Sequence, residues 1–172
     1  TFTGAALLTA TTVTTGGGND TLVLNDPDAK FVVSTGDNTG GNDTVTITDV
    51  AANSSVSLGS GNDLATVGTL VSGTDALTLE AGAGNDIVTL KDEGAEVQID
   101  MGDGTGDKVV LEATGDGVYA KVGIKNVEEL DISALGATGA TFTWAQLSAN
   151  DTAFTLTGDG DDVLKVTGAN PA

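Results

Sequence analysis

Short acidic turns recur along the chain at nearly constant spacing. Their common form is Gly-x-Gly-Asn-Asp, and the copies occupy residues 16–20, 40–43, 59–63 and 82–86, with looser versions at 102–107 and 158–162. The closing aspartates of the first five copies are Asp20, Asp43, Asp63, Asp86 and Asp107, at intervals of 23, 20, 23 and 21 residues. A spacing that drifts without breaking is typical of repeated coils joined by loops of variable length.

The residue types in these turns are those of a calcium site. Glycine permits tight backbone turns that direct carbonyl oxygens to a common centre, and the closing aspartate adds a carboxylate. Calcium takes six to eight such oxygens, so each ion would lie between turns of neighbouring coils. One Gly-Asn-Asp copy is equally well an ordinary β-turn. Six copies favour metal, because carboxylates about 5 Å apart repel by several kcal/mol.

The side chains predicted to form the metal turns are aspartates and asparagines. They are Asp20, Asp43, Asp63, Asp86, Asp107, Asp162, Asp103, Asp159, Asn19, Asn42, Asn62 and Asn85. We expect about five or six calcium ions. The opposite turns are also acidic but less regular, and solvated loops are the simpler interpretation there; Asp26, Asp28 and Asp116 are the best candidates for extra sites.

The elements that must position these turns are short strands. Alternating apolar residues follow the turns at 21–24, 44–47, 87–90, 108–111 and 163–166, and a second set occupies 30–33, 55–58, 76–79 and 96–99. Alternation with β-branched residues indicates half-buried strands. Two short strands per coil of about 20–23 residues predict an all-β fold, a parallel β-solenoid of the β-roll or β-helix kind, with a thin aliphatic core.

We expect a single solenoid domain over residues 1–172. Its predicted parts are a first coil or cap (1–14), regular calcium-turn coils (15–112), irregular coils (113–156) and a last calcium turn and end (157–172). Within the irregular part, 127–132 predicts a strand, and 141–147 predicts either a wider coil or a short helical excursion. No Met begins the chain and no signal peptide is visible, which favours a mature or excised segment.

Composition excludes several classes of function. The chain has 25 acidic residues against six Lys and no Arg, for a formal net charge of −19. Nucleic acid and anionic membranes require clustered basic residues, and no apolar run approaches the roughly 18 residues of a membrane span. Cys and His are also absent, which removes thiol nucleophiles, histidine-based triads and zinc sites. We therefore do not expect an enzyme.

The repeated turns resemble the RTX (repeat-in-toxin) calcium-binding β-roll, whose nonapeptide is Gly-Gly-x-Gly-x-Asp-x-apolar-x. The resemblance covers residues 15–111 and 157–166 and implies calcium binding by the closing aspartates and the turn carbonyls. The matching glycines are Gly16, Gly18, Gly41, Gly59, Gly61, Gly82, Gly84, Gly158 and Gly160. Unlike most RTX rolls, this chain has one Gly-rich turn per coil. Residues 126–132 resemble a strand of bacterial surface-layer and large adhesin proteins.

This resemblance implies a secreted protein of the bacterial cell surface, exported by type I secretion. The expected function is structural: calcium-driven folding and self-assembly into a surface layer, filament or adhesin stalk, with copies of itself as partners. The alternatives are a calcium-dependent carbohydrate-binding module that contacts a cell-surface glycan and, less favoured, a calcium-dependent polysaccharide lyase. Sugar sites favour exposed aromatics, of which Trp144 and Tyr119 are the main candidates, although Trp144 is more simply explained by packing.

Overall fold

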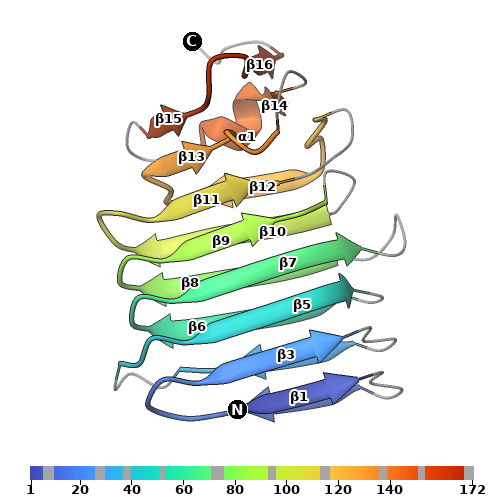
Figure 1. The fold of residues 1–172 in the computed structure, drawn as a ribbon, viewed down its shortest axis with the longest axis vertical. Coiled ribbons are helices and arrows are strands. Elements are labelled where there is room, and N and C mark those ends of the chain that lie inside the picture. Colours follow the sequence, from blue (N-terminus) through green and yellow to red (C-terminus); the bar gives the residue numbers. More distant parts are fainter. Residues whose placement is uncertain are drawn as a thin grey trace.

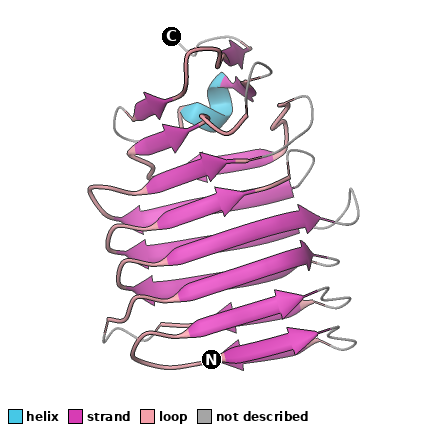
Figure 2. Cartoon of the chain, viewed as in Figure 1, coloured by secondary structure: helices cyan, strands magenta, loops and turns pink. Residues whose placement is uncertain are grey.

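The computed structural model describes residues 1–5, 10–25, 30–36, 40–50, 53–70, 76–92, 96–112, 117–135, 139–150 and 154–168. Within these residues the chain forms sixteen strands, β1 to β16, and one short helix, α1. Figure 2 shows that strands dominate and that the helix lies near the C-terminal end of the stack. The predicted all-β class is confirmed.

The strands stack into two long parallel sheets. Sheet A holds β1 (Phe2–Ala5), β3 (Thr21–Asn25), β5 (Thr44–Val50), β7 (Leu64–Leu70), β9 (Ile87–Leu90), β11 (Lys108–Leu111), β13 (Glu129–Asp131) and β15 (Thr155–Thr157), in that order. Sheet B holds β2 (Thr11–Thr14), β4 (Phe31–Ser34), β6 (Ser54–Ser60), β8 (Ala76–Ala83), β10 (Glu96–Asp103) and β12 (Val122–Lys125). Sequence neighbours therefore alternate between sheets, and Figure 1 shows the stack rising from β1 to β15.

This order is that of a parallel β-solenoid, as the repeat spacing predicts. Each of the first six coils contributes one strand to each sheet, so a strand pairs with the strands one coil before and one coil after. The register is constant: Val45 of β5 faces Leu22 of β3 on one side and Ala65 of β7 on the other. Backbone groups of the inner strands are thereby satisfied on both edges.

The core lies between sheets A and B and is aliphatic. In β5, Val45 and Ile47 are fully buried while Thr44 and Thr46 are half-buried, which is the alternation expected of a strand with one face inward. Leu77 and Leu79 repeat the pattern in β8. The largest buried side chains are mostly Leu, and the aromatic pair Tyr119 and Phe142 stacks near the C-terminal end, with ring centroids 5.3 Å apart.

The last coils depart from the regular pattern. A third sheet, sheet C, pairs β14 (Ala140–Thr143) with β16 (Leu164–Thr167), and residue Val118 bridges to Thr141 at its edge. Helix α1 (Trp144–Leu147) follows β14 directly and contacts β12 where the next strand of sheet B would lie. The segment 141–147 is thus a strand followed by a short helix, the second of the two readings of the sequence.

The strand after the sixth turn does not continue sheet A. The predicted strand 163–166 corresponds to β16, but β16 pairs in sheet C, and the last strand of sheet A is β15, which precedes this turn. The strand that follows the sixth turn therefore pairs outside sheet A. The cause is the added sheet C, which begins one coil earlier and takes the strand that follows the sixth turn.

The other predicted strands are found, with ends shifted by a few residues. The structure adds β7, β12, β14, β15 and the first two strands to the ranges expected from the sequence. Among the described residues, no helix has the length and apolar character needed to cross a membrane.

Candidate metal centre

The closing aspartates of the first five turns form one column along an edge of the solenoid. Each carboxylate from Asp43 onward accepts a hydrogen bond from the backbone N–H of the aspartate one coil earlier. The pairs are Asp20 N to Asp43 Oδ1 (2.8 Å), Asp43 N to Asp63 Oδ1 (2.7 Å), Asp63 N to Asp86 Oδ1 (2.8 Å) and Asp86 N to Asp107 Oδ1 (2.8 Å). The structure therefore brings these predicted site residues together, one per coil.

The column carboxylates are buried, and each has an oxygen without a partner. Asp43 and Asp63 are 2% exposed, and Asp86 and Asp107 are fully buried. The Oδ2 atoms of all four, and that of Asp20, are buried without a hydrogen-bond partner. A buried carboxylate oxygen without a partner is costly, so this set calls for a proton or a cation.

Electrostatics inside the column oppose ionisation. Burial, together with the charges of Asp63 and Asp107, raises the pKa of Asp86 to about 6, against the hydrogen bond from the Asp63 N–H, which lowers it. Burial likewise raises the pKa of Asp63, with a contribution from Asp43. Burial also raises the pKa of Asp107, with a contribution from Glu128. Burial and the neighbouring carboxylates therefore disfavour the negatively charged forms of Asp63, Asp86 and Asp107.

Lysine side chains do not relieve this charge among the described residues. The four ion pairs found there join Lys91 to Glu112, Lys108 to Glu129 and to Asp131, and Lys125 to Asp100. All of them link the outward-facing side chains of neighbouring coils. None includes a column aspartate, so the positive charge that balances the column has to come from another source.

The asparagines of the turns form a second ladder beside the column. The side-chain Oδ1 atoms of Asn19, Asn42 and Asn62 accept the backbone N–H of the asparagine one coil later, at 2.8–2.9 Å. Asn85 makes the same contact with Thr105 N at 3.3 Å. The asparagine ladder runs in the opposite direction to the aspartate column. Its direct effect is to hold successive turns in register.

Glycine is required where these turns stack because backbone oxygens converge there. A Cβ on Gly61, whose φ is +147°, would stand 1.9 Å from Gly41 O and 3.1 Å from Asp63 Oδ1. A Cβ on Gly104 would stand 2.3 Å from Gly84 O and 2.5–2.6 Å from both carboxylate oxygens of Asp107. The gaps at Gly61 and Gly104 are therefore lined by a carbonyl from the earlier coil and a carboxylate from the later coil.

The other predicted glycines of the regular coils have either a positive φ or a backbone carbonyl where a Cβ would lie. Positive φ is found at Gly16, Gly18, Gly59, Gly61, Gly82 and Gly84. Gly41 lacks positive φ, but a Cβ there would stand 2.4 Å from Gly18 O. The second glycines of successive turns thus follow one another up the same edge as the aspartates.

The sixth turn lies apart from this column. Asp162 Oδ2 accepts the backbone N–H of Asp159 within its own turn, and its Oδ1 is buried without a partner. Asp159 itself is exposed, as are Gly158 and Gly160, and a Cβ on Gly160 would meet nothing within 4 Å. Asp103 is also exposed, at the end of β10. Asp26, Asp28 and Asp116 lie outside the described residues.

The structure adds Glu128 to the column. Asp107 N donates to Glu128 Oε2 at 2.9 Å, in the way each earlier aspartate donates to the next. The sequence separation of 21 residues equals that between Asp86 and Asp107. Spacing alone could have identified Glu128, but the change of residue type and the missing glycines concealed it.

Calcium fits the donor set of the column, although carboxylates alone do not make the site. Among the residues that the structure describes, no group of three or more acidic side chains gathers as a metal cluster. The stacking distance of strands, about 4.8 Å, keeps successive carboxylates apart. A cation here would need backbone carbonyls as well, and Gly84 O lies close to the partnerless Oδ2 atom of Asp107.

Comparison with protein-family models, with curated proteins and with solved structures gives no significant match.

Proposed function

We propose that this chain is an extracellular calcium-binding structural protein, in which calcium drives coil stacking and the folded solenoid assembles with copies of itself. The observation that carries the proposal is the column of buried aspartates whose Oδ2 atoms lack partners. The ligands would be Asp43, Asp63, Asp86 and Asp107, together with turn carbonyls. Their RTX-like motif accords with a bacterial surface-layer or adhesin segment.

Calcium would supply to this chain the positive charge that its own lysines do not. The formal net charge is −19, and the column concentrates part of it in a buried line. In calcium-poor cytosol the chain would stay expanded, and outside the cell millimolar calcium would neutralise the column. Folding after export follows from this difference, because binding that occurs only in the folded state stabilises it.

A carbohydrate-binding function is less well supported. The outer face of sheet B carries a groove of about 680 Å³ beside α1, lined by polar residues such as Gln98, Asp100 and Lys121. None of its described lining residues is aromatic, whereas sugar sites favour aromatic platforms. Trp144 is 38% exposed but is not part of this lining, and Tyr119 is fully buried.

The proposal is tested by calcium-dependent folding. Circular dichroism and thermal unfolding are measured with calcium, with chelator and with magnesium at equal ionic strength. We expect calcium to stabilise the fold by at least about 3 kcal/mol, the value for one site at a hundredfold excess over Kd. The Asp63→Asn variant is expected to lose part of this gain because Asn cannot supply the negative charge.

A matched control is Glu80→Gln, which removes one negative charge from the exposed face of sheet B. It is expected to keep the full calcium response. Equal stability with calcium and with chelator would refute the proposal. So would an equal loss of calcium response in the two variants, which would mean that calcium acts only on net charge.

A further inference from the structure

The aspartate column ends at a residue of a different type. Lys108 of β11 is the register partner of Glu129 of β13. The residues before them, Asp107 and Glu128, therefore hold equivalent positions on successive coils. Its Oε2 accepts the Asp107 N–H at 2.9 Å, close to the 2.8 Å of the Asp86–Asp107 contact. Glu128 therefore satisfies the last backbone donor of the column.

The turn that carries Glu128 is contracted. Glu80, Asp100 and Lys125 are register partners in sheet B, and Ile87, Lys108 and Glu129 are register partners in sheet A. The connections between them are residues 81–86, 101–107 and 126–128, which are six, seven and three residues long. The shortest contains no glycine. It therefore lacks the pair of glycines that directs carbonyls into the gaps of the regular coils.

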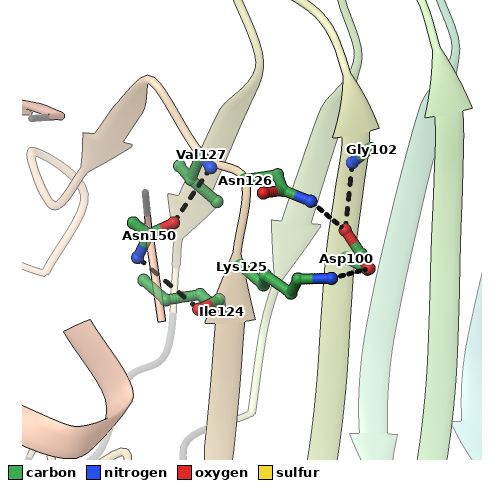
Figure 3. Close-up of polar contacts among 7 residues, drawn as sticks. All are labelled: Asp100, Gly102, Ile124, Lys125, Asn126, Val127 and Asn150. Carbon is green, nitrogen blue, oxygen red and sulfur yellow. Dashed lines mark hydrogen bonds and ion pairs between the residues drawn. The ribbon is translucent and has the colours of Figure 1, made fainter. Parts of the chain in front are cut away.

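Side chains from both neighbouring coils hold the contracted turn in place (Figure 3). Asn126, with φ +56°, donates from Nδ2 to Asp100 Oδ1 at 2.7 Å, and Lys125 pairs with Asp100 Oδ2 at 2.9 Å. From the other side, Asn150 Oδ1 accepts the Val127 N–H at 3.0 Å. Direct protein contacts thus fix this turn, where the regular turns leave carboxylate oxygens unsatisfied.

The buried carboxylate oxygens without a hydrogen-bond partner end at Asp107, one coil before Glu128. Asp107 Oδ2 is buried and lacks a partner, whereas neither carboxylate oxygen of Glu128, a half-buried residue, is among the buried, partnerless atoms of the described chain. The carboxylate of Asp107 faces back toward Gly84 O, in the gap between the turns at 82–86 and 102–107. Five stacked turns enclose four such gaps, closed by Asp43, Asp63, Asp86 and Asp107.

Resting on the proposed function, we infer that Glu128 terminates the cation column. It takes the hydrogen-bonding place of a sixth aspartate without holding an ion, so the column binds four calcium ions, one in each gap between five Gly-rich turns. The number is smaller than the five or six expected from counting motifs, because the turn at 158–162 lies outside the column. Glu128 is a positioning residue that acts through the Asp107 backbone.

The test compares calcium stoichiometry among single variants by native mass spectrometry and equilibrium dialysis. Glu128→Gln keeps an acceptor for the Asp107 N–H and is expected to bind the wild-type number of ions. Asp162→Asn is also expected to keep that number. Asp107→Asn is expected to bind one ion fewer, as is Asp43→Asn at the other end of the column.

A second measurement reports the positioning role directly. Hydrogen exchange at the Asp107 amide is expected to stay slow in Glu128→Gln and to accelerate at least about tenfold in Glu128→Ala, which has no acceptor. Unchanged exchange in Glu128→Ala would overturn this role.

The outcomes separate the inference from the function on which it rests. Loss of one ion in Glu128→Gln or in Asp162→Asn would overturn the four-ion column while leaving calcium binding intact. Absence of bound calcium in the wild type would overturn both. Retention of all ions in Asp107→Asn would overturn the assignment of carboxylates to gaps.

Discussion

At the scale of single residues, the aspartates of the column combine two tasks. One carboxylate oxygen, Oδ1, accepts a backbone N–H from the coil before, and the other, Oδ2, is left without a protein partner. The first contact fixes the orientation of the side chain, and the second leaves an oxygen available for a cation. Asparagine at the same place could accept the hydrogen bond but would bring no charge.

The raised pKa of Asp86 predicts an unusual pH dependence for the calcium-free protein. Its pKa rises from 3.8 to about 6 on folding, so the folded state binds this proton more tightly than the unfolded state. The contribution of Asp86 to the free energy of unfolding is therefore highest below about pH 4, falls as the pH rises to about 6, and stays low above that. The loss is on the order of 1 kcal/mol or more.

Urea unfolding of calcium-free protein between pH 4 and pH 7 measures this effect. Asp86→Asn serves as the reference, because it cannot titrate and keeps an acceptor for the Asp63 N–H. The wild type is expected to lose stability relative to this variant as the pH rises. A difference between the two proteins that does not vary with pH would contradict the raised pKa of Asp86.

At the scale of elements, the fold depends on backbone packing in the Gly-rich turns. Gly41, Gly61, Gly82 and Gly84 lie so close to the carbonyls of the coil before that no side chain fits between them. This packing explains why the motif repeats glycine and not merely any turn residue. It also sets the distance at which carbonyl and carboxylate oxygens meet.

Substitution of one such glycine is expected to destabilise the solenoid strongly. In Gly61→Ala the new Cβ would stand 1.9 Å from Gly41 O, at a φ of +147° that disfavours any side chain. We expect a loss of at least about 3 kcal/mol in the free energy of unfolding with calcium present. Gly160→Ala, where a Cβ meets nothing within 4 Å, is expected to change it by less than about 0.5 kcal/mol. Similar unfolding midpoints for both variants would contradict this packing.

The regular coils could be predicted from the sequence because their signals are local. In β5 and β10, alternation of apolar and polar residues marks the strand, and the turn motif lies at the start of β5 and at the end of β10. Strand β7 is less evident because its sequence, Leu-Ala-Thr-Val-Gly-Thr-Leu, includes Ala and Gly. The five-membered aspartate column also follows from spacing. Its buried, partnerless oxygens do not, because they depend on the packing of whole coils.

The C-terminal cap could not be predicted because its contacts are distant in sequence. Gln146 Nε2 donates to the carbonyls of Tyr119 and Val122, and Asn150 Nδ2 approaches Ile124 O at 3.5 Å. These side chains bind carbonyls of β12 and of the residues just before it, with α1 replacing a strand. A sequence pattern for a four-residue helix gives no indication that it covers a sheet 24 to 27 residues earlier.

At the scale of the whole molecule, the two ends of the solenoid differ. At the N-terminal end, β1 and β2 are the edge strands of sheets A and B. At the C-terminal end, α1 covers sheet B, while β15 of sheet A remains an edge and Leu156, register partner of the buried Leu130, is 44% exposed. Unpaired strand edges favour association with further strands, and among the described strands of sheet A, β15 offers such an edge at the C-terminal end of the stack.

Self-assembly through these ends predicts a position-specific effect of charge. Leu156→Lys places a cation on the C-terminal end of the core and is expected to reduce calcium-dependent association at least about tenfold. Val32→Lys changes a side chain of similar exposure, 38%, on the outer face of sheet B and is expected to have little effect. Light scattering and electron microscopy with calcium measure both. A wild type that stays monomeric at high concentration, or equal loss of association in both variants, would refute assembly through the ends.

The opposed directions of the two ladders bear on the order in which coils form. A newly arriving coil donates its asparagine N–H to the coil already in place, and its aspartate receives the N–H of that coil. The arriving coil completes both hydrogen bonds, and the coils already in place need not rearrange. The solenoid can thus grow coil by coil from its N-terminal side, each docked coil offering a backbone N–H and an asparagine Oδ1 to the next.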